Sequence, residues 1–78
     1  MYFKEAISQR ILDLCQQNHL TPNRLAELSA IAPTTFRDII SNKVNNPSSV
    51  VIYKVCKTLK IELKDFFDDD LFKNEFDD

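Results

Sequence analysis

The chain has 78 residues, of which 44% are apolar and 28% are charged. These proportions are those of a globular domain rather than a disordered chain, and the length allows one small domain with a thin core. No apolar run approaches the roughly 18 residues needed to cross a bilayer, and the N-terminus lacks the basic-then-apolar order of a secretory signal. We therefore expect a cytoplasmic protein.

Glycine is absent, and only two cysteines are present. The lack of glycine excludes the glycine-rich phosphate loops and disfavours tight hairpins, so a β-rich fold is not expected. Cys15 and Cys56 form no CxxC pair, and a small secreted domain would normally carry more cysteines. We expect both to be reduced thiols on apolar helix faces.

Charge is divided unevenly along the chain. Residues 1–64 hold nine basic and five acidic residues, a net charge of +4, whereas residues 65–78 hold one basic and seven acidic residues, a net charge of −6. The whole-chain charge of −2 therefore hides a mildly basic body followed by an acidic tail.

The first three predicted helices follow from apolar spacing and capping residues. An apolar stripe with helical spacing predicts a helix over residues 5–18. Thr21 followed by Pro22 gives an N-cap and a favourable first position for a second helix, about two turns long. Pro33 starts a third helix in the same way, and that helix ends near Ser41. No segment shows the period of two that a half-buried strand requires.

Two further helices complete the expected fold. Ser48 is the N-cap of a fourth helix, whose apolar stripe runs to Leu59, and a short fifth helix is predicted over residues 63–68. The fold class is therefore all-α, a compact five-helix bundle. We expect a domain over residues 1–67 and an acidic, Phe-containing C-terminal tail over residues 68–78.

The residues that enzymes and metal sites need are scarce. The single histidine, His19, lies at a predicted helix end, where we interpret it as a solvated cap. Cys15 and His19 share a helix face and would make half of a metal site, but Cys56 is the only other soft ligand. The acidic run of residues 68–70 is interpreted as solvated. We expect no enzymatic activity, no metal and no cofactor.

Residues 21–41 have the form of a helix-turn-helix, in which a short turn separates two short helices. On the second helix, the apolar residues fall on one side: Phe36, Ile39 and Ile40. The opposite side is polar: Thr34, Arg37, Asp38 and Ser41. Any amphipathic surface helix shows such a division. The preceding short helix and the polar loop that follows are what favour DNA binding.

The chain also resembles a known family. The segment from Leu20 to Ser29, followed by residues 36–39 (FRDI), is similar to the phage repressor/Cro-type helix-turn-helix, often called XRE. Residues 41–48 (SNKVNNPS) resemble that family's Asn-Gly-Lys…Asn-Pro-Ser loop, and residues 61–67 (IELKDFF) resemble its closing Val-Ser-Leu-Asp-Glu-Leu-Phe. The resemblance covers nearly the whole chain before the tail and implies a lambda-repressor-like fold.

This resemblance implies a bacterial or phage transcription regulator, acting as a repressor, that places its third helix in the major groove of double-stranded DNA. The base-facing positions are Pro33, Thr34, Arg37 and Asp38. The expected phosphate contacts are Arg10, Thr21, Asn23, Ser41, Lys43, Asn45 and Asn46. Arg37 would pair with guanine or with phosphate, and Asp38 would accept from cytosine or orient Arg37.

Five positions depart from the family's pattern. Pro22 stands where many members have a phosphate-contacting Gln. Ala30 and Asn42 replace the turn and loop glycines. Ser41 replaces an Asn that contacts the DNA backbone, and Ala32 replaces the Ser that caps the third helix. These departures weaken the expected clamping of phosphate and leave the expected fold unchanged.

The tail carries three apolar residues among its acids: Leu71, Phe72 and Phe76. This stripe would pack on the chain's own body, on a second subunit or on another protein. Because the family commonly binds as dimers, we expect a homodimer on a palindromic operator, with these residues at a dimer or partner contact.

A rival interpretation is a protein-interaction module on the same scaffold, such as an antitoxin or an anti-repressor partner. Pro22 and the net negative charge favour this rival, whereas the basic body and the Arg37 face favour the regulator.

Overall fold

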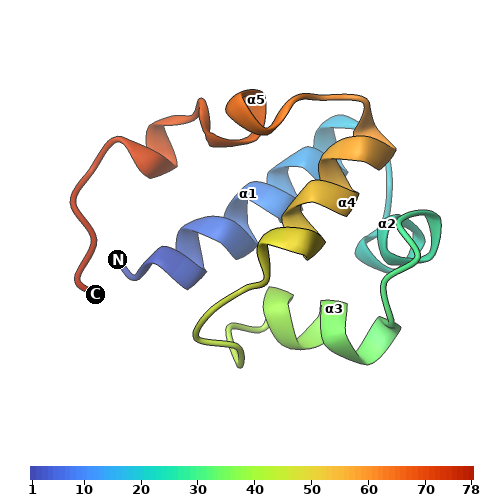
Figure 1. Ribbon diagram of the computed structural model, residues 1–78, viewed down its shortest axis with the longest axis horizontal. Helices are drawn as coiled ribbons and strands as arrows, with labels where there is room; N and C mark the ends of the chain where they lie inside the picture. Colours follow the sequence, from blue (N-terminus) through green and yellow to red (C-terminus); the bar gives the residue numbers. More distant parts are fainter.

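The computed structural model describes residues 1–78 and is entirely helical apart from its connections (Figure 1). The elements are α1 (Phe3–Gln17), α2 (Pro22–Leu28), α3 (Pro33–Ile40), α4 (Ser49–Leu59), α5 (Leu63–Phe67) and a short 3₁₀ helix, η1 (Asp70–Phe72). The predicted all-α class is confirmed, and the five α-helices lie close to their expected positions. None of these helices combines the length and the apolar character that crossing a membrane requires.

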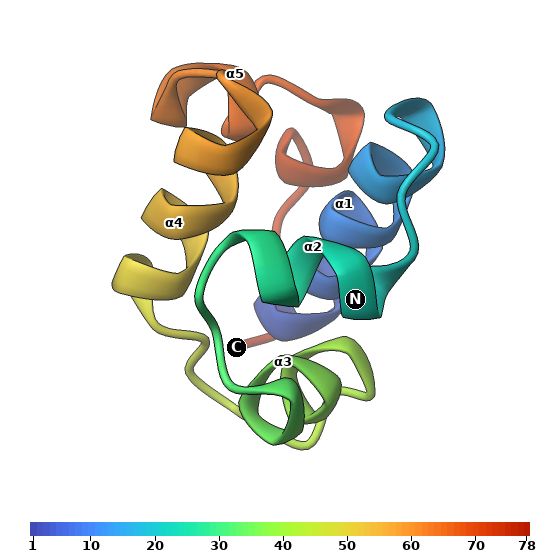
Figure 2. The ribbon, with the colours of Figure 1, turned by 90° about the vertical axis from the view of Figure 1, so that its right-hand side faces the viewer.

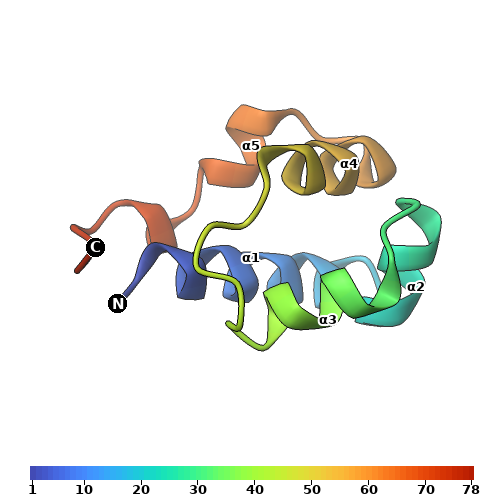
Figure 3. The ribbon, with the colours of Figure 1, turned by 60° about the horizontal axis from the view of Figure 1, so that its bottom comes forward.

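The helices enclose one core from several sides. In Figure 2, α2 crosses above α3, and Figure 3 shows α1 and α3 on one side of the molecule with α4 and α5 on the other. Phe36 of α3 and Phe66 of α5 are the largest fully buried side chains. The same core therefore holds α3 and the C-terminal helix. Its buried members are Ile7, Ile11, Leu14, Cys15, Leu25, Ala26, Ile31, Phe36, Ile39, Ile52, Val55, Cys56 and Phe66.

Side-chain caps start two of the helices at the predicted residues. Oγ1 of Thr21 accepts a hydrogen bond from the backbone N–H of Arg24 at 3.1 Å, and Oγ of Ser48 accepts one from Val50 at 3.1 Å. Helix α3 begins without a side-chain cap because Ala32 holds its N-cap position. Its first turn therefore presents free backbone N–H groups at the edge of the molecule.

Four helices end in a left-handed residue although the chain has no glycine. The residues with φ between 55° and 63° are His19, Ala30, Asn42 and Lys60. The N–H of each following residue returns to a carbonyl five positions earlier, as Ile31 does to Ala26 at 2.9 Å, which completes a Schellman motif. Leu20, Ile31 and Ile61 follow three of these turns and pack on the core. Ala30 therefore sets the turn between α2 and α3 in a conformation that favours glycine.

The tail packs on the chain's own body, which is one of the three surfaces that the sequence left open for it. The Phe72 ring lies 5.0 Å from Phe67 and 6.1 Å from Phe3, and the Phe76 ring lies 5.2 Å from Phe3. Phe72 and Phe76 are thus half-buried against α1 and α5, and Leu71 is also half-buried. These rings are used within the protomer, because Phe3 and Phe67 already offer them an apolar surface. One side of each ring is therefore already covered, and the dimer or partner contact predicted for Leu71, Phe72 and Phe76 stays a prediction.

The end of the tail is fastened to the start of α1. The backbone N–H of Asp77 donates to the carbonyl of Met1 at 3.1 Å, and the N–H of Phe3 donates to Oδ1 of Asp78 at 2.8 Å. The two chain ends lie side by side in Figure 1. A carboxylate at a helix N-terminus meets unpaired N–H groups and the positive end of the helix dipole.

Candidate nucleic-acid interface

One side of α3 is uncovered at the edge of the molecule (Figures 1 and 2). Phe36 and Ile39 are each 2% exposed and anchor the opposite side of the helix in the core, while Asp38 is half-buried. The exposed residues of α3 are Pro33, Thr34, Thr35 and Arg37. The polar face predicted for this helix is therefore accessible to a partner as large as a DNA duplex.

Thr35 is an exposed α3 residue that sequence reasoning did not select. It follows Thr34 directly, so it lies 100° around the helix, on the flank of the polar face rather than at its centre. A wider angular window would have included it. Its hydroxyl adds a hydrogen-bonding group at the start of the uncovered side.

The start of α2 offers polar groups but no free charge. Thr21 uses its oxygen to cap the helix, which leaves its O–H free to donate, and Asn23 is exposed. The one cation here, Arg24, forms an ion pair with Glu27 on the next turn. With Pro22 at the first helical position, this end of α2 contributes neutral hydrogen bonds rather than charge.

The loop after α3 is anchored to α1. Oδ1 of Asn42 accepts a hydrogen bond at 2.9 Å from the hydroxyl of Ser8, a buried residue of α1. The Ser41 hydroxyl donates back to the carbonyl of Arg37 at 2.9 Å, which leaves its oxygen available only as an acceptor. Lys43 is exposed and makes no ion pair. The loop thus presents a free cation beside α3 on a fixed backbone.

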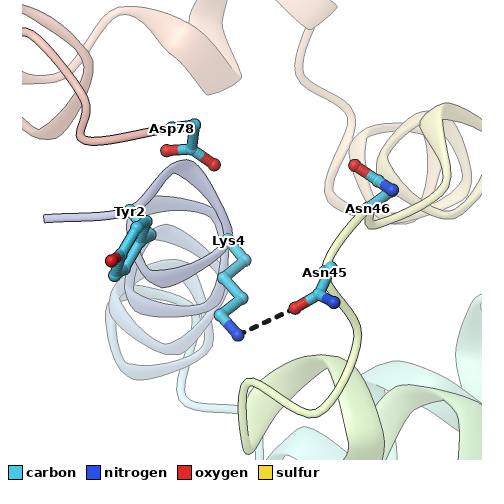
Figure 4. A pocket seen from close by; sticks show the side chains of 5 residues that line it. All are labelled: Tyr2, Lys4, Asn45, Asn46 and Asp78. Atoms are coloured by element: carbon cyan, nitrogen blue, oxygen red, sulfur yellow. Dashed lines mark hydrogen bonds between the residues drawn. The ribbon is translucent and has the colours of Figure 1, made fainter.

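Figure 4 shows a hollow where this loop meets the N-terminus of α1. Nζ of Lys4 donates to Oδ1 of Asn45 at 3.0 Å, and Asn46 lines the same hollow, which has a volume of about 460 Å³. Tyr2 and Asp78 complete the lining. Lys4 is a cation that sequence reasoning missed, because nothing local links it to a residue 41 positions away. Asp78 adds a carboxylate, whose charge is opposite to that of Lys4, to the same hollow.

The position of Arg10 disagrees with the prediction that this residue contacts phosphate. Its guanidinium is directed inward: Nε donates to the carbonyl of Phe66 at 2.7 Å and Nη2 to that of Asp65 at 2.8 Å. Nη1 forms an ion pair with Asp69 at 3.2 Å, and the side chain is 10% exposed. The carbonyl of Phe66 lies in the last turn of α5 without a helical partner, and that of Asp65 accepts only the N–H of the C-cap Asp68 at 3.3 Å, so both accept from this fork of donors. All three guanidinium nitrogens of Arg10 are thus engaged inside the protein.

The charge division seen along the sequence persists in space. Residues 39–61, which form the end of α3, the loop and α4, contain no acidic residue. They contain four lysines: Lys43, Lys54, Lys57 and Lys60. The acids of residues 65–78 gather instead around α5, η1 and the chain ends. A positive potential therefore follows the loop and α4.

The cysteines belong to the core and not to a reactive site. Cys15 is 3% and Cys56 2% exposed, which confirms their predicted place on buried helix faces. Burial raises the pKa of the Cys15 thiol, and burial is also the main cause of the raised pKa of Cys56. Both side chains are therefore neutral thiols at physiological pH and poor nucleophiles.

Comparison with known proteins places this geometry in a family. A family model described as the Cro/C1-type HTH DNA-binding domain matches residues 10–70. The chain is also similar to a solved structure, that of prophage Lp1 protein 11, with a TM-score of 0.85 and 32% sequence identity over 96% of this chain and 100% of that chain. A search of curated proteins finds no match. The family resemblance read from the sequence is confirmed.

Proposed function

Because the chain belongs to the family of Cro/C1-type helix-turn-helix DNA-binding domains, we propose that it binds a specific double-stranded operator and represses transcription. In this proposal the protein acts in the cytoplasm, on the cell's own DNA or on phage DNA. The observation that carries the proposal is the uncovered side of α3. A short, core-anchored helix projects Arg37 and Thr34 outward, beside a loop that holds a free Lys43.

In this proposal α3 enters the major groove and reads base edges. Arg37 is exposed and has no acidic partner within salt-bridge distance, so its fork is free to take the O6 and N7 atoms of a guanine. Asp38 is adjacent and half-buried, and it either accepts from a cytosine amine or orients Arg37. Thr34 and the ring of Pro33 face a thymine methyl.

Phosphate contacts surround α3 on two sides. The start of α2 supplies Thr21 and Asn23. The loop supplies four residues: Ser41, Lys43, Asn45 and Asn46. Lys4 joins this set through its hydrogen bond to Asn45, and Arg10 leaves it because its guanidinium is engaged inside the protein. Few of these groups are cationic, so we expect a shallow dependence of affinity on salt.

A palindromic operator bound by a homodimer is part of the proposal. An eight-residue α3 reaches only a few base pairs, and pairing two copies doubles the sequence that is read. Because Phe72 and Phe76 are engaged within the protomer, we place the contact between copies on α5, where Leu63 is 47% and Phe67 37% exposed. Sedimentation of Leu63→Glu, compared with the unaltered chain, tests this placement.

The experiment for DNA binding starts with selection of duplexes from a random pool, together with the DNA around the chain's own gene. Arg37→Ala is then measured on a selected duplex and on its scrambled version. We expect a loss of about 5-fold to 150-fold on the selected duplex and a much smaller loss on the scrambled one. Lys60→Ala, at the far end of α4, is the matched control and should change binding less than about twofold.

Two results would contradict the proposal. If no duplex is enriched even at low salt, the chain is not a sequence-specific DNA-binding protein. If Arg37→Ala weakens both duplexes equally, Arg37 contacts phosphate and does not read bases.

A further inference from the structure

A second hollow lies between the end of α2 and α4, and none of the DNA contacts proposed above lines it. We call it the α2–α4 groove; its volume is about 490 Å³. Its lining residues are Leu28, Ser29, Ala30, Val50, Tyr53, Lys54, Lys57 and Thr58. Figure 2 faces this side of the molecule, with α4 and the end of α2 above α3. DNA binding by α3 gives these residues no role.

The groove exposes apolar side chains that the protomer leaves uncovered. Leu28 is 48%, Val50 57% and Tyr53 53% exposed. Single exposed apolar residues are ordinary, but here three large ones from two helices line one hollow with a polar rim. Tyr53 adds a hydroxyl on an aromatic body, a combination that suits a contact with an apolar centre and a wet edge.

The rim of the groove is positive and unopposed. Lys54 and Lys57 lie on the same face of α4 as Val50 and Tyr53, because these positions are spaced at three, four and seven residues. Neither lysine forms an ion pair, and no acid occurs between Asp38 and Glu62 in the sequence. An acidic partner would therefore meet no competing carboxylate from this helix.

The floor of the groove is fixed before any partner arrives. The hydroxyls of Ser29 and Thr58 are hydrogen-bonded at 2.7 Å, and Thr58 donates to the carbonyl of Lys54 at 3.0 Å. Ser29 is 6% exposed, so this link between α2 and α4 is largely shielded from water. A preformed groove lowers the ordering cost of binding.

We infer that the α2–α4 groove binds an acidic, amphipathic helical segment of another protein. A leucine or phenylalanine of that segment sits against Leu28, Val50 and Tyr53, and its carboxylates meet Lys54 and Lys57. A DNA backbone would satisfy the lysines but leave the three apolar side chains facing phosphate. The chain's own tail has suitable residues, but its Phe72 and Phe76 rings are already packed on Phe3. This function goes beyond DNA binding.

The test is an NMR titration of the ¹⁵N-labelled full chain with a synthetic amphipathic helix that carries leucines on one face and glutamates elsewhere. We expect backbone shifts confined to residues 28–30 and 50–58, with a Kd on the order of 10–100 μM for such a generic probe. A second peptide with every glutamate replaced by glutamine is the control for charge and should bind at least about fivefold more weakly.

Variants then assign the binding to the groove. The double variant Lys54→Glu with Lys57→Glu should weaken peptide binding at least about tenfold. Tyr53→Ala should weaken peptide binding to the same extent, although it leaves the charge unchanged. The matched control, Lys60→Glu with Lys64→Glu, changes the net charge equally outside the groove and should have less than about a twofold effect. Thermal unfolding of each variant checks that the fold is kept.

Several outcomes would overturn the inference. These are the absence of binding, shifts centred on α3, or equal binding of the glutamine peptide. Shifts in the groove that depend on protein concentration without peptide would assign it to a second copy of the chain. If duplex DNA shifts the groove residues and the Lys54 and Lys57 variant weakens DNA binding as strongly as peptide binding, the groove belongs to the DNA footprint.

Discussion

Arg10 of α1 donates from Nε to the backbone carbonyl of Phe66 at 2.7 Å, across 56 positions of sequence. The same guanidinium reaches the carbonyl of Asp65 and the carboxylate of Asp69, and it lies 6.0 Å from the centre of the Phe66 ring. One side chain therefore ends α5, positions the start of the tail and holds Phe66 in the core. Its role is structural, and two measurements separate that role from DNA contact.

Arg10→Lys should destabilise the fold by about 2 kcal/mol or more. An ammonium cannot reach three acceptors in a planar fork, so at least one carbonyl at the end of α5 is left unpaired. Urea unfolding measures the change. Arg24→Lys is the control, because that exposed ion pair should contribute less than about 1 kcal/mol. The DNA affinity of folded Arg10→Lys should equal that of the unaltered chain; a loss would restore Arg10 as a phosphate contact.

Local signals explain what was predictable from the sequence. Thr21 with Pro22, and Ser48, marked helix starts because a cap acts within three residues. Periodicity marked the buried side of α3 and hence its exposed side. The partners of Arg10 and the contact of Lys4 with Asn45 were not predictable, since they join residues more than forty positions apart. An arginine on a helix looks the same whether it caps another helix or faces phosphate.

The contacts of the tail were not predictable for the same reason, because they join residues far apart in the sequence. Its composition predicted acidic character and an apolar stripe, but not which surface would accept the rings. That choice depended on Phe3, a residue that the helical pattern assigned to no core position and that meets both Phe72 and Phe76.

Ala30→Gly should stabilise the protein by about 0.5–1 kcal/mol. Ala30 has a φ of 55°, where its Cβ crowds the backbone, and glycine removes this steric strain. Glycine also raises the conformational entropy of the unfolded chain, which offsets part of the gain in stability. Ala26→Gly is the control: Ala26 is buried within α2, so it should destabilise by about 1 kcal/mol or more. Chemical unfolding compares the two, and a destabilised Ala30→Gly would contradict the left-handed turn.

Both thiols should react slowly with a disulfide reagent in the native protein and rapidly in denaturant. Cys15 and Cys56 are almost completely buried, and burial raises the pKa of each, so neither the thiolate nor access to it is available in the folded state. Absorbance of the released thiolate follows the reaction. Fast native labelling of either residue would place that cysteine at the surface.

The raised pKa values of Cys15 and Cys56 also predict a decline of stability in alkali. The unfolded thiols lose their protons first as the pH rises past about 8.5, so the unfolded state then binds fewer protons than the folded one. The contribution of the two thiols to the free energy of unfolding is fully present below that pH, and it is lost as the pH rises through the pKa values of the folded state. Urea midpoints from pH 7 to 10 should fall more steeply for the unaltered chain than for Cys15→Ala with Cys56→Ala. Parallel profiles would show that other groups cause the decline.

Asp77→Asn with Asp78→Asn should strengthen DNA binding at low salt. Asp78 lines the same hollow as Lys4, Asn45 and Asn46, so its carboxylate repels a phosphate approaching the loop. A charge at a distance of about 10 Å in water changes binding by roughly 0.4 kcal/mol, so removing two should raise the affinity about fourfold. The gain should disappear near 1 M salt, where the Debye length is only about 3 Å.

The control is Asp68→Asn with Asp70→Asn, which changes the total charge equally but alters carboxylates near Lys73 and η1. Because repulsion depends on proximity, this control should have a clearly smaller effect, measured by fluorescence anisotropy on one duplex at several salt concentrations. Equal gains in both double variants would mean that only net charge matters. No gain in either would mean that the end of the tail lies outside the DNA-binding surface.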